Sequence, residues 1–387
     1  MRKIVNVTNL LLLLLVGICL SCEKIDSFQE QSFAHSKSNS KLERSIMMRE
    51  VNYYVSKWSN LDPSALGLKE LLAKIILDQQ NGVVEKSVIH LIADINSGDA
   101  SGIRVPAHTT ITGGGGAYGE NGKAIYTSIP RYKWLFIVVG ENVTFERLRL
   151  IGPWSSYIAN PLYSQSSGVF FDKRANRGVV QFCEVSGFPG VAISFSSVDN
   201  IVYGNNIHGN YMIYTKNTVS ETIGYGVLVK DGGQAVIHNN YFDNNQHAIA
   251  GGGKNTLGVE SSFEAYLNNV KDSKCQMRSH HFDMHGNDLD AFAGNEIKIY
   301  NNVFYYTARS NGWWPSAIII RGIPQNYCKV YNNAFVNDKN INSAVRQIFE
   351  FSNNNIPFRP LNMYVWDNVC DGYPGDYYTS IVWTPGI

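Results

Sequence analysis

Apolar and polar positions follow a pattern that returns seven times between residues 180 and 370. Each return has an apolar or aromatic stretch, a polar pair and a further apolar residue, and six of the seven place asparagine second in the pair. The segments are 180–185, 202–207, 237–242, 266–270, 299–304, 330–335 and 365–370. Their spacing of 22 to 35 residues suits one supersecondary unit each, so the pattern predicts a stack of short repeats.

A right-handed parallel β-helix explains both the repeat and its asparagines. Each coil buries its inward face only when neighbouring coils stack at the inter-strand spacing of roughly 4.8 Å. Asparagine tolerates the left-handed turn conformation and hydrogen-bonds to the same residue one coil away. Leucine-rich solenoids would show leucines at fixed offsets, and an antiparallel sandwich has no such long register. We therefore expect an all-β solenoid over residues 96–387, with one column formed by Asn206, Asn240, Asn269, Asn302, Asn333 and Asn368.

One helix is predicted ahead of the solenoid. Asp62-Pro63-Ser64 is a typical helix start, and apolar residues then recur on one face as far as Gln79. Such a helix covers the open end of a solenoid and its exposed strand edges. Residues 45–95 are therefore expected to form an N-terminal helical cap.

Two segments resemble the opening coils of the pectate-lyase-like superfamily, namely 103–116, which ends in four glycines, and 136–153. The resemblance extends over roughly residues 85 to 375 and implies the same right-handed parallel β-helix. It implies less about activity, because lyases, hydrolases, epimerases and non-enzymes share this solenoid. Lyases of the superfamily commonly use Lys or Arg as the base together with calcium, and their acidic calcium-binding cluster is not evident in this sequence.

The N-terminus has the features of an export signal. Arg2 and Lys3 precede an apolar run over 10–20, which is shorter than the roughly 20 residues needed to span a bilayer. The run ends at Cys22 in a sequence that resembles the bacterial lipobox, in which the cysteine receives the lipid. We therefore expect a signal peptide over 1–21 and a lipid anchor with a flexible tether over 22–44. The protein would then be exported and anchored to the bacterial cell envelope, with the outer membrane favoured. An ordinary signal peptide with an incidental cysteine is the alternative.

The amino-acid composition limits the kinds of molecule that the protein is expected to bind. Lys and Arg number 33 and Asp and Glu number 32, so no strong electrostatic field favours nucleic acid. The abundance of Asn, Gly, Ser and Tyr suits a β-rich surface that meets polar ligands, and a monomer is expected. Beyond Cys19 and Cys22 there are four cysteines, which lack the paired spacing of a zinc site: Cys183, Cys275, Cys328 and Cys370. Buried single thiols are favoured, although export permits disulfides.

Ionisable residues gather on the second strand of successive coils. Phe282 and Met284 alternate with His281, Asp283 and His285, so the two apolar residues are expected in the core and the three polar ones outside it. When the second strands are aligned, the positions that stack beside this strand hold His247, Lys230, Arg321 and Glu350. The sequence therefore predicts one solvent-accessible groove with catalytic residues His247, His281, Asp283 and His285. Because these face solvent, replacing them is expected to leave stability nearly unchanged.

Several kinds of chemistry fit such a groove. In a polysaccharide lyase, imidazole serves as the base near neutral pH, and Lys230 or Arg321 neutralises a uronate carboxylate. In an inverting glycoside hydrolase, Asp283 and Glu350 would form the carboxylate pair. In a divalent metal site for calcium or zinc, His281, Asp283 and His285 would bind the ion together with His247. A ladder of solvated polar residues is the alternative without function.

Aromatic residues complete the expected site. Tyr305, Trp313 and Trp314 follow the His-Asp-His strand, and sugar rings stack on aromatic faces beside polar clefts. Packing of a long loop against the solenoid explains these residues equally well. The function predicted from the sequence is a cell-envelope lipoprotein that acts on extracellular polysaccharide, as a lyase on a glycan that contains uronic acid. The alternatives are an inverting glycoside hydrolase and a non-catalytic glycan-binding lipoprotein.

Overall fold

The computed structural model describes residues 48–387 except Val84, 130–133, 154–165, 212–223, 272–279, 287–291, 307–315, 338–343, 350–361, 372–377 and 383–387. Residues Met48–Ile387 form one compact unit. The predicted signal peptide, the lipidation site Cys22, and the candidates Trp313, Trp314 and Glu350 lie outside the described residues, as does Cys275. Among the described residues, no helix has the length and apolar character needed to cross a membrane.

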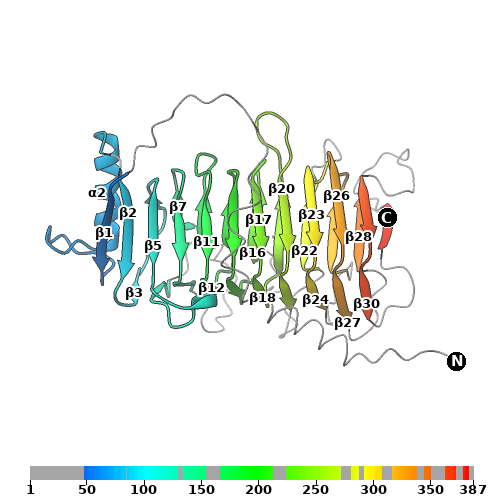
Figure 1. The fold of residues 1–387 in the computed structure, drawn as a ribbon, viewed down its shortest axis with the longest axis horizontal. Coiled ribbons are helices and arrows are strands. Elements are labelled where there is room, and N and C mark those ends of the chain that lie inside the picture. Colours follow the sequence, from blue (N-terminus) through cyan, green and yellow to red (C-terminus); the bar gives the residue numbers. More distant parts are fainter. Residues whose placement is uncertain are drawn as a thin grey trace. The chain divides into compact units, whose positions relative to one another are not determined.

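Three parallel sheets make up the fold, and each coil contributes one strand to each sheet (Figure 1). Within the described ranges, the first sheet has eleven strands: β1 (Glu50–Val55), β2 (Lys86–Leu91), β5 (Thr109–Thr112), β8 (Thr144–Glu146), β11 (Val179–Gln181), β14 (Asn200–Tyr203), β17 (Gln234–His238), β20 (Ser262–Tyr266), β23 (Glu296–Tyr300), β26 (Tyr327–Tyr331) and β29 (Met363–Trp366).

The second and third sheets have ten strands each in the described part of the chain. The second sheet comprises β4 (Ile103–Val105), β7 (Trp134–Val138), β10 (Ser167–Phe171), β13 (Val191–Phe195), β16 (Tyr225–Lys230), β19 (His247–Gly252), β22 (Phe282–His285), β25 (Ile318–Arg321), β28 (Val345–Phe349) and β31 (Tyr378–Val382). The third comprises β3 (Ile95–Asn96), β6 (Ala124–Tyr126), β9 (Arg149–Ile151), β12 (Glu184–Ser186), β15 (Asn206–His208), β18 (Tyr241–Asp243), β21 (Asn269–Lys271), β24 (Val303–Tyr306), β27 (Ala334–Asn337) and β30 (Val369–Asp371).

The core lies between the three sheets and consists of inward side chains stacked from coil to coil. Phe171 and Phe195 stack at 4.7 Å between ring centroids, and Phe304 and Phe335 at 5.0 Å. Phe282 and Met284 belong to this core, as their alternation with polar residues predicted. The all-β right-handed parallel β-helix expected from the repeat is therefore confirmed.

An asparagine ladder runs along the turns between the first and third sheets. Its members are Asn205, Asn240, Asn268, Asn302, Asn333 and Asn368. The Nδ2 group of each donates to Oδ1 of the next, over 2.9 to 3.0 Å. The sequence prediction of Asn206 and Asn269 in this column was wrong by one position. The reason is that each ladder residue follows a residue with positive φ, which is Gly204 or Leu267 in those two coils.

The N-terminal part differs in detail from the expected helical cap. Helix α2 (Leu68–Gln80) begins six residues later than predicted, because Asp62 accepts hydrogen bonds from the amide and hydroxyl of Ser64 in a preceding turn. Strands β1 and β2 pair in parallel, and β2 pairs with β5. Strand pairing therefore begins at Glu50, inside the segment 45–95. Helix α2 packs its buried leucines onto the core and contacts β4.

Cys183 and Cys328 are free, buried thiols, in agreement with the preference for single thiols. Burial raises the pKa of Cys183 to about 12 and also raises the pKa of Cys328. Both thiols are therefore protonated at neutral pH and serve as small apolar core residues.

Candidate functional site

The ionisable residues of the predicted site lie on the outer side of β16, β19, β22 and β25 in the second sheet. In register, Lys230 pairs with Gly252, Gly252 with His285, and His285 with Arg321. The predicted neighbours Lys230, His285 and Arg321 are thus in one row. The residue between Lys230 and His285 in this row is Gly252.

Asp283 is the centre of the cluster. Its carboxylate is fully buried and accepts two hydrogen bonds from Arg321, one from Nε to Oδ1 at 2.9 Å and one from Nη2 to Oδ2 at 3.0 Å. This parallel pair is the geometry in which guanidinium and carboxylate interact most strongly. Arg321 therefore supplies the positive charge that keeps a carboxylate without solvent contact in its ionised form.

Three imidazoles converge on the same carboxylate oxygen. The Nε2 atoms of His285, His280 and His247 lie 2.6, 3.0 and 3.6 Å from Oδ2 of Asp283. The rings of His247 and His280 stack at 4.4 Å, and Nδ1 of His247 lies 2.9 Å from the His280 carbonyl oxygen. Because a carbonyl only accepts, Nδ1 of His247 carries the proton and its Nε2 faces Asp283 as a lone pair.

His280 occupies the place that the sequence assigned to His281. In register Ile249 pairs with Phe282, so His280 rather than His281 lies opposite His247. The amides of His281 and Phe282 both donate to the Ala317 carbonyl, as in a β-bulge, at the start of β22. His281 instead lies with its ring 6.2 Å from that of Phe304 and its Nε2 3.2 Å from the Tyr305 carbonyl. The prediction of His281 in the catalytic cluster was therefore wrong. The available signal for His280 was its position in the same histidine-rich stretch.

The expected open groove is also corrected. His247, His281 and Asp283 are buried, and only part of the cluster reaches solvent. The exposed fractions of the side chains are 43% for His285, 35% for Lys230 and 23% for Arg321. An outward strand position is buried when neighbouring side chains close over it, as His247, His280 and Arg321 do over Asp283. Because Asp283 is buried and paired with Arg321, we expect its replacement to cost stability, unlike the nearly unchanged stability expected from the sequence.

The residues of the cluster differ in their charge at neutral pH and in their exposure to solvent. Burial alone would raise the pKa of Asp283, but His285 and Arg321 hold that pKa well below its usual range. Burial lowers the pKa of His247 well below its ordinary value and also lowers that of His280. At neutral pH, Asp283 is therefore ionised and these two histidines are neutral, which leaves His285 as the solvent-exposed imidazole of the cluster.

In the described part of this column, another residue occupies the position that was predicted for Glu350. Asp283 pairs in register with Ile319, and Ile319 pairs with Arg346. The alignment of the strands in the sequence was therefore displaced by four residues in this coil, because it placed Glu350 where Arg346 lies. Glu350 lies outside the described residues. Asp283 is also ion-paired on both oxygens and has no solvent contact, so it can neither donate a proton to a glycosidic oxygen nor activate a water.

The same residues can be compared with the requirements of a metal-binding site. Ligand atoms of His247, His280 and Asp283 all lie within 4.8 Å of one another, and two imidazoles with a carboxylate suit zinc. However, Nη2 of Arg321 lies 3.0 Å from Oδ2 of Asp283 and 3.2 Å from Nε2 of His280. A metal ion bound at these atoms would be repelled by the positively charged guanidinium of Arg321. The residues therefore fit a site in which Arg321 balances the buried charge, and His281 is not among the converging groups.

Tyr305 lies on β24 of the third sheet rather than beside the cluster. Nζ of Lys271 lies 4.8 Å above its ring, and its backbone carbonyl rather than its ring approaches His281. The prediction of Tyr305 as a stacking platform for the polar cluster is thus not supported by its position. Trp313 and Trp314 lie in the range 307–315, outside the described residues.

The stability of the folded chain is expected to depend on the protonation of His281. Burial lowers the pKa of this imidazole from 6.5 to about 4. Between these values the unfolded chain binds the proton and the folded chain does not, so stability falls as the pH decreases from 6.5 to 4. The difference in unfolding free energy between wild type and His281→Gln should therefore shrink by about 3 kcal/mol from pH 7 to pH 4. Urea unfolding at both pH values measures it, and a difference that does not change with pH would contradict the buried, neutral imidazole.

The sequence matches no family model and no curated protein. Solved structures are similar in fold. An alginate lyase from Paenibacillus sp. strain FPU-7 has a TM-score of 0.56 at 13% identity, covering 86% of this chain and 98% of the lyase. A tailspike protein of E. coli bacteriophage HK620 in complex with a pentasaccharide has a TM-score of 0.51 at 14% identity, covering 85% of this chain and 65% of the tailspike chain. At these identities the likeness shows the shared parallel β-helix fold.

Proposed function

We propose that the protein is a polysaccharide lyase that acts on a glycan containing uronic acid, with His285 as the base. One observation carries the proposal: the solvent-exposed His285 contacts the buried, arginine-paired carboxylate of Asp283, in a row with Arg321 and Lys230. An alginate lyase and an oligosaccharide-bound tailspike protein among the similar folds support a polysaccharide as the substrate. The export signal predicted from the sequence would bring such an enzyme to extracellular polysaccharide.

The contact with Asp283 orients His285 for proton abstraction. A carboxylate only accepts hydrogen bonds, so Nε2 of His285 carries a proton at its 2.6 Å contact, and Nδ1 of the neutral ring has the lone pair. Because Asp283 stays ionised, it also stabilises the imidazolium that forms when Nδ1 takes a proton. The dyad thus performs base chemistry while Asp283 itself does not titrate near neutral pH.

The positive side chains supply the second requirement of elimination. The proton next to a uronate carboxylate becomes acidic only when the negative charge on that carboxylate is neutralised. Lys230 and Arg321 flank His285 in register, with Gly252 between Lys230 and His285. Two rungs separate Lys230 from His285, about 9.6 Å, and Gly252 places no side chain on the rung between them.

The proposed reaction balances without an external oxidant or reductant. His285 takes the proton from carbon 5 of the uronate, and the electron pair of that bond forms the double bond between carbons 4 and 5. The bond from carbon 4 to the bridging oxygen breaks, and the leaving oxygen takes a proton from solvent. His285 then returns its proton to solvent, which restores the neutral base.

The test is turnover on a panel of uronic-acid polysaccharides, read both for the absorbance of unsaturated products and for reducing ends. We expect both signals from the wild type, and a loss of about 10²- to 10⁴-fold in rate in His285→Ala. His90→Ala is the matched control, because His90 is a half-buried histidine on β2 in the first sheet that contacts Asn52. Reducing ends without unsaturated products would show a hydrolase instead. Binding without either signal would show a non-catalytic module, and either result overturns the proposal.

A further inference from the structure

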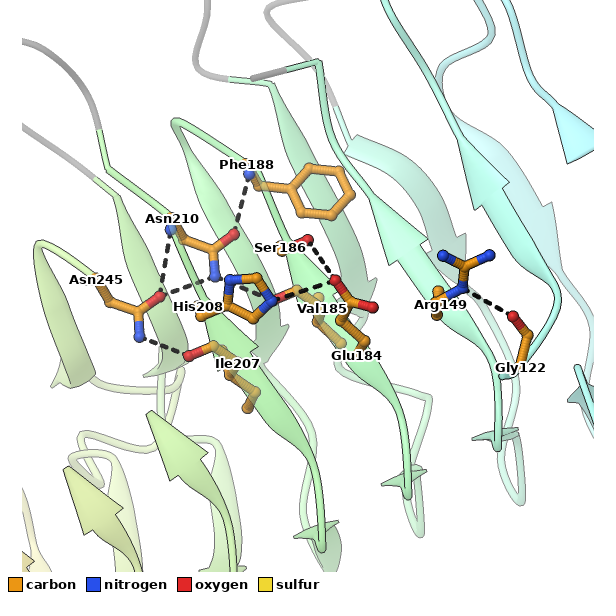
Figure 2. Close-up of polar contacts among 10 residues, drawn as sticks. All are labelled: Gly122, Arg149, Glu184, Val185, Ser186, Phe188, Ile207, His208, Asn210 and Asn245. Carbon is orange, nitrogen blue, oxygen red and sulfur yellow. Dashed lines mark hydrogen bonds and ion pairs between the residues drawn. The ribbon is translucent and has the colours of Figure 1, made fainter. Parts of the chain in front are cut away.

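A pocket lies on the outer face of the third sheet, apart from the Asp283 cluster of the second sheet. Its volume is about 430 Å³. Its lining residues come from strands β9, β12 and β15 and from the segment that includes the 3₁₀ turn η2 (Ala117–Gly119). Those with polar or aromatic side chains are Tyr118, Glu120, Asn121, Arg149, Glu184 and Asn206. Figure 2 shows Arg149, Glu184 and His208 on this part of the third sheet.

The segment at the pocket rim is held against the sheet. The amide of Tyr118 donates to the Gly204 carbonyl at 3.2 Å. Gly119 packs so closely that a Cβ atom there would lie 2.3 Å from the amide nitrogen of Glu184. Tyr118 has a φ of 57° and a side chain that is 48% exposed. A bulky residue with this backbone conformation is unusual and costs free energy, and such strain concentrates at ligand-binding sites.

The floor of the pocket presents fixed acceptors and donors. Oε1 of Glu184 lies 3.2 Å from Nε2 of His208 and 3.3 Å from Oγ of Ser186 (Figure 2). The hydrogen bond from His208 lowers the pKa of Glu184, so this carboxylate is an acceptor at neutral pH. Nε of Arg149 donates to the Gly122 carbonyl at 2.8 Å, which fixes the guanidinium at the pocket wall.

Asn206 adds a polar atom that has no partner among the described residues. Its Oδ1 is buried and makes no hydrogen bond. A buried acceptor without a partner costs free energy, and a ligand hydroxyl that reaches it would remove this cost. The pocket therefore combines carboxylates, a guanidinium, an unsatisfied amide oxygen and an exposed aromatic ring, which together match the hydroxyl groups and the apolar face of a sugar.

We propose that this pocket binds a neutral sugar unit of a glycan, as a second carbohydrate site on the third sheet. Two carboxylates, Glu120 and Glu184, face one guanidinium, Arg149, so the lining disfavours a uronate. The carboxylates and Asn206 accept from sugar hydroxyls, Arg149 donates to them, and Tyr118 stacks on the ring. The proposal does not rest on the lyase activity, because it uses other residues on another sheet.

The test measures binding of neutral tetrasaccharides of glucose, mannose, galactose and xylose to the whole protein by ligand-observed NMR. Matched tetrasaccharides of glucuronate and glucosamine are measured beside them. We expect at least one neutral ligand to bind with a Kd of about 1 mM or below, more tightly than the charged ones. Glu184→Gln and Tyr118→Ala should each weaken this binding about tenfold or more.

The controls are chosen to match these variants. Glu264→Gln removes a similarly half-buried, ion-paired carboxylate on the first sheet, and Tyr364→Ala removes an exposed tyrosine on β29. Both should bind like the wild type, and thermal melting of all variants establishes that they fold. Three outcomes would overturn the proposal: no neutral ligand binds, a charged ligand binds as tightly as the neutral ones, or binding is unchanged in Glu184→Gln and Tyr118→Ala. A failure of the lyase assay would leave these results unaffected.

Discussion

Replacing Arg321 with leucine is expected to destabilise the fold by about 3–5 kcal/mol, because it removes the guanidinium that pairs with both oxygens of the buried Asp283 carboxylate. Arg321 donates to both carboxylate oxygens, and the neighbouring His247 and His280 are held neutral by burial. Protonating either histidine to replace the lost charge would cost free energy, because a charged imidazole at these buried positions has lost its hydration. Urea unfolding at neutral pH measures the loss.

Two further variants distinguish an uncompensated buried charge from a simple loss of packing. The double variant Asp283→Leu with Arg321→Leu removes both charges, so most of the lost stability should return. The matched control is Lys298→Leu, which breaks the half-exposed ion pair of Lys298 with Glu264 and should cost less than about 1 kcal/mol. A double variant as unstable as Arg321→Leu would contradict the account of an uncompensated buried charge.

Replacing Asn268 with alanine is expected to cost about 3 kcal/mol or more, because several buried hydrogen bonds are lost together. Oδ1 of Asn268 accepts from both the amide and Nδ2 of Asn240, and its Nδ2 donates to the Ile237 carbonyl and to Oδ1 of Asn302. Alanine would leave donors and acceptors in both neighbouring coils without partners and without water.

Asn269→Ala is the matched control, one residue away. Asn269 is the first residue of strand β21. Its Oδ1 makes no hydrogen bond within the described part of the chain. We expect no loss of stability greater than about 0.5 kcal/mol, because alanine removes a buried acceptor that has no partner in the described structure. Chemical denaturation of the two variants compares them directly. Equal losses, or a larger loss in Asn269→Ala, would contradict the ladder and would favour the column that the sequence suggested.

The comparison of these two asparagines shows how far the sequence specifies the fold. The repeat and its asparagine pairs were enough to predict the parallel β-helix, because stacked coils repeat the same turn. They were not enough to choose the ladder residue within a pair. That choice depends on which residue adopts positive φ, and Leu267 does so in one coil although leucine disfavours this conformation.

The candidate site was predicted in part for similar reasons. The row of Lys230, His285 and Arg321 follows from alternation and from coil-to-coil stacking, both of which are local in sequence. The register that places His280 rather than His281 opposite His247 depends on backbone hydrogen bonds that the residue pattern does not reveal. Burial of Asp283 depends on side chains from three different coils, so the alternation of one strand could not predict it.

A crystal structure of His285→Ala with a uronate oligosaccharide that the wild type cleaves tests the proposed lyase site most directly. The account predicts a uronate carboxylate within hydrogen-bonding distance of Arg321 or Lys230, with its carbon 5 directed at the position that the imidazole occupies in the wild type. An oligosaccharide bound only elsewhere, for example in the pocket beside Glu184 and Tyr118, would contradict the assignment of the reaction to the Asp283 cluster.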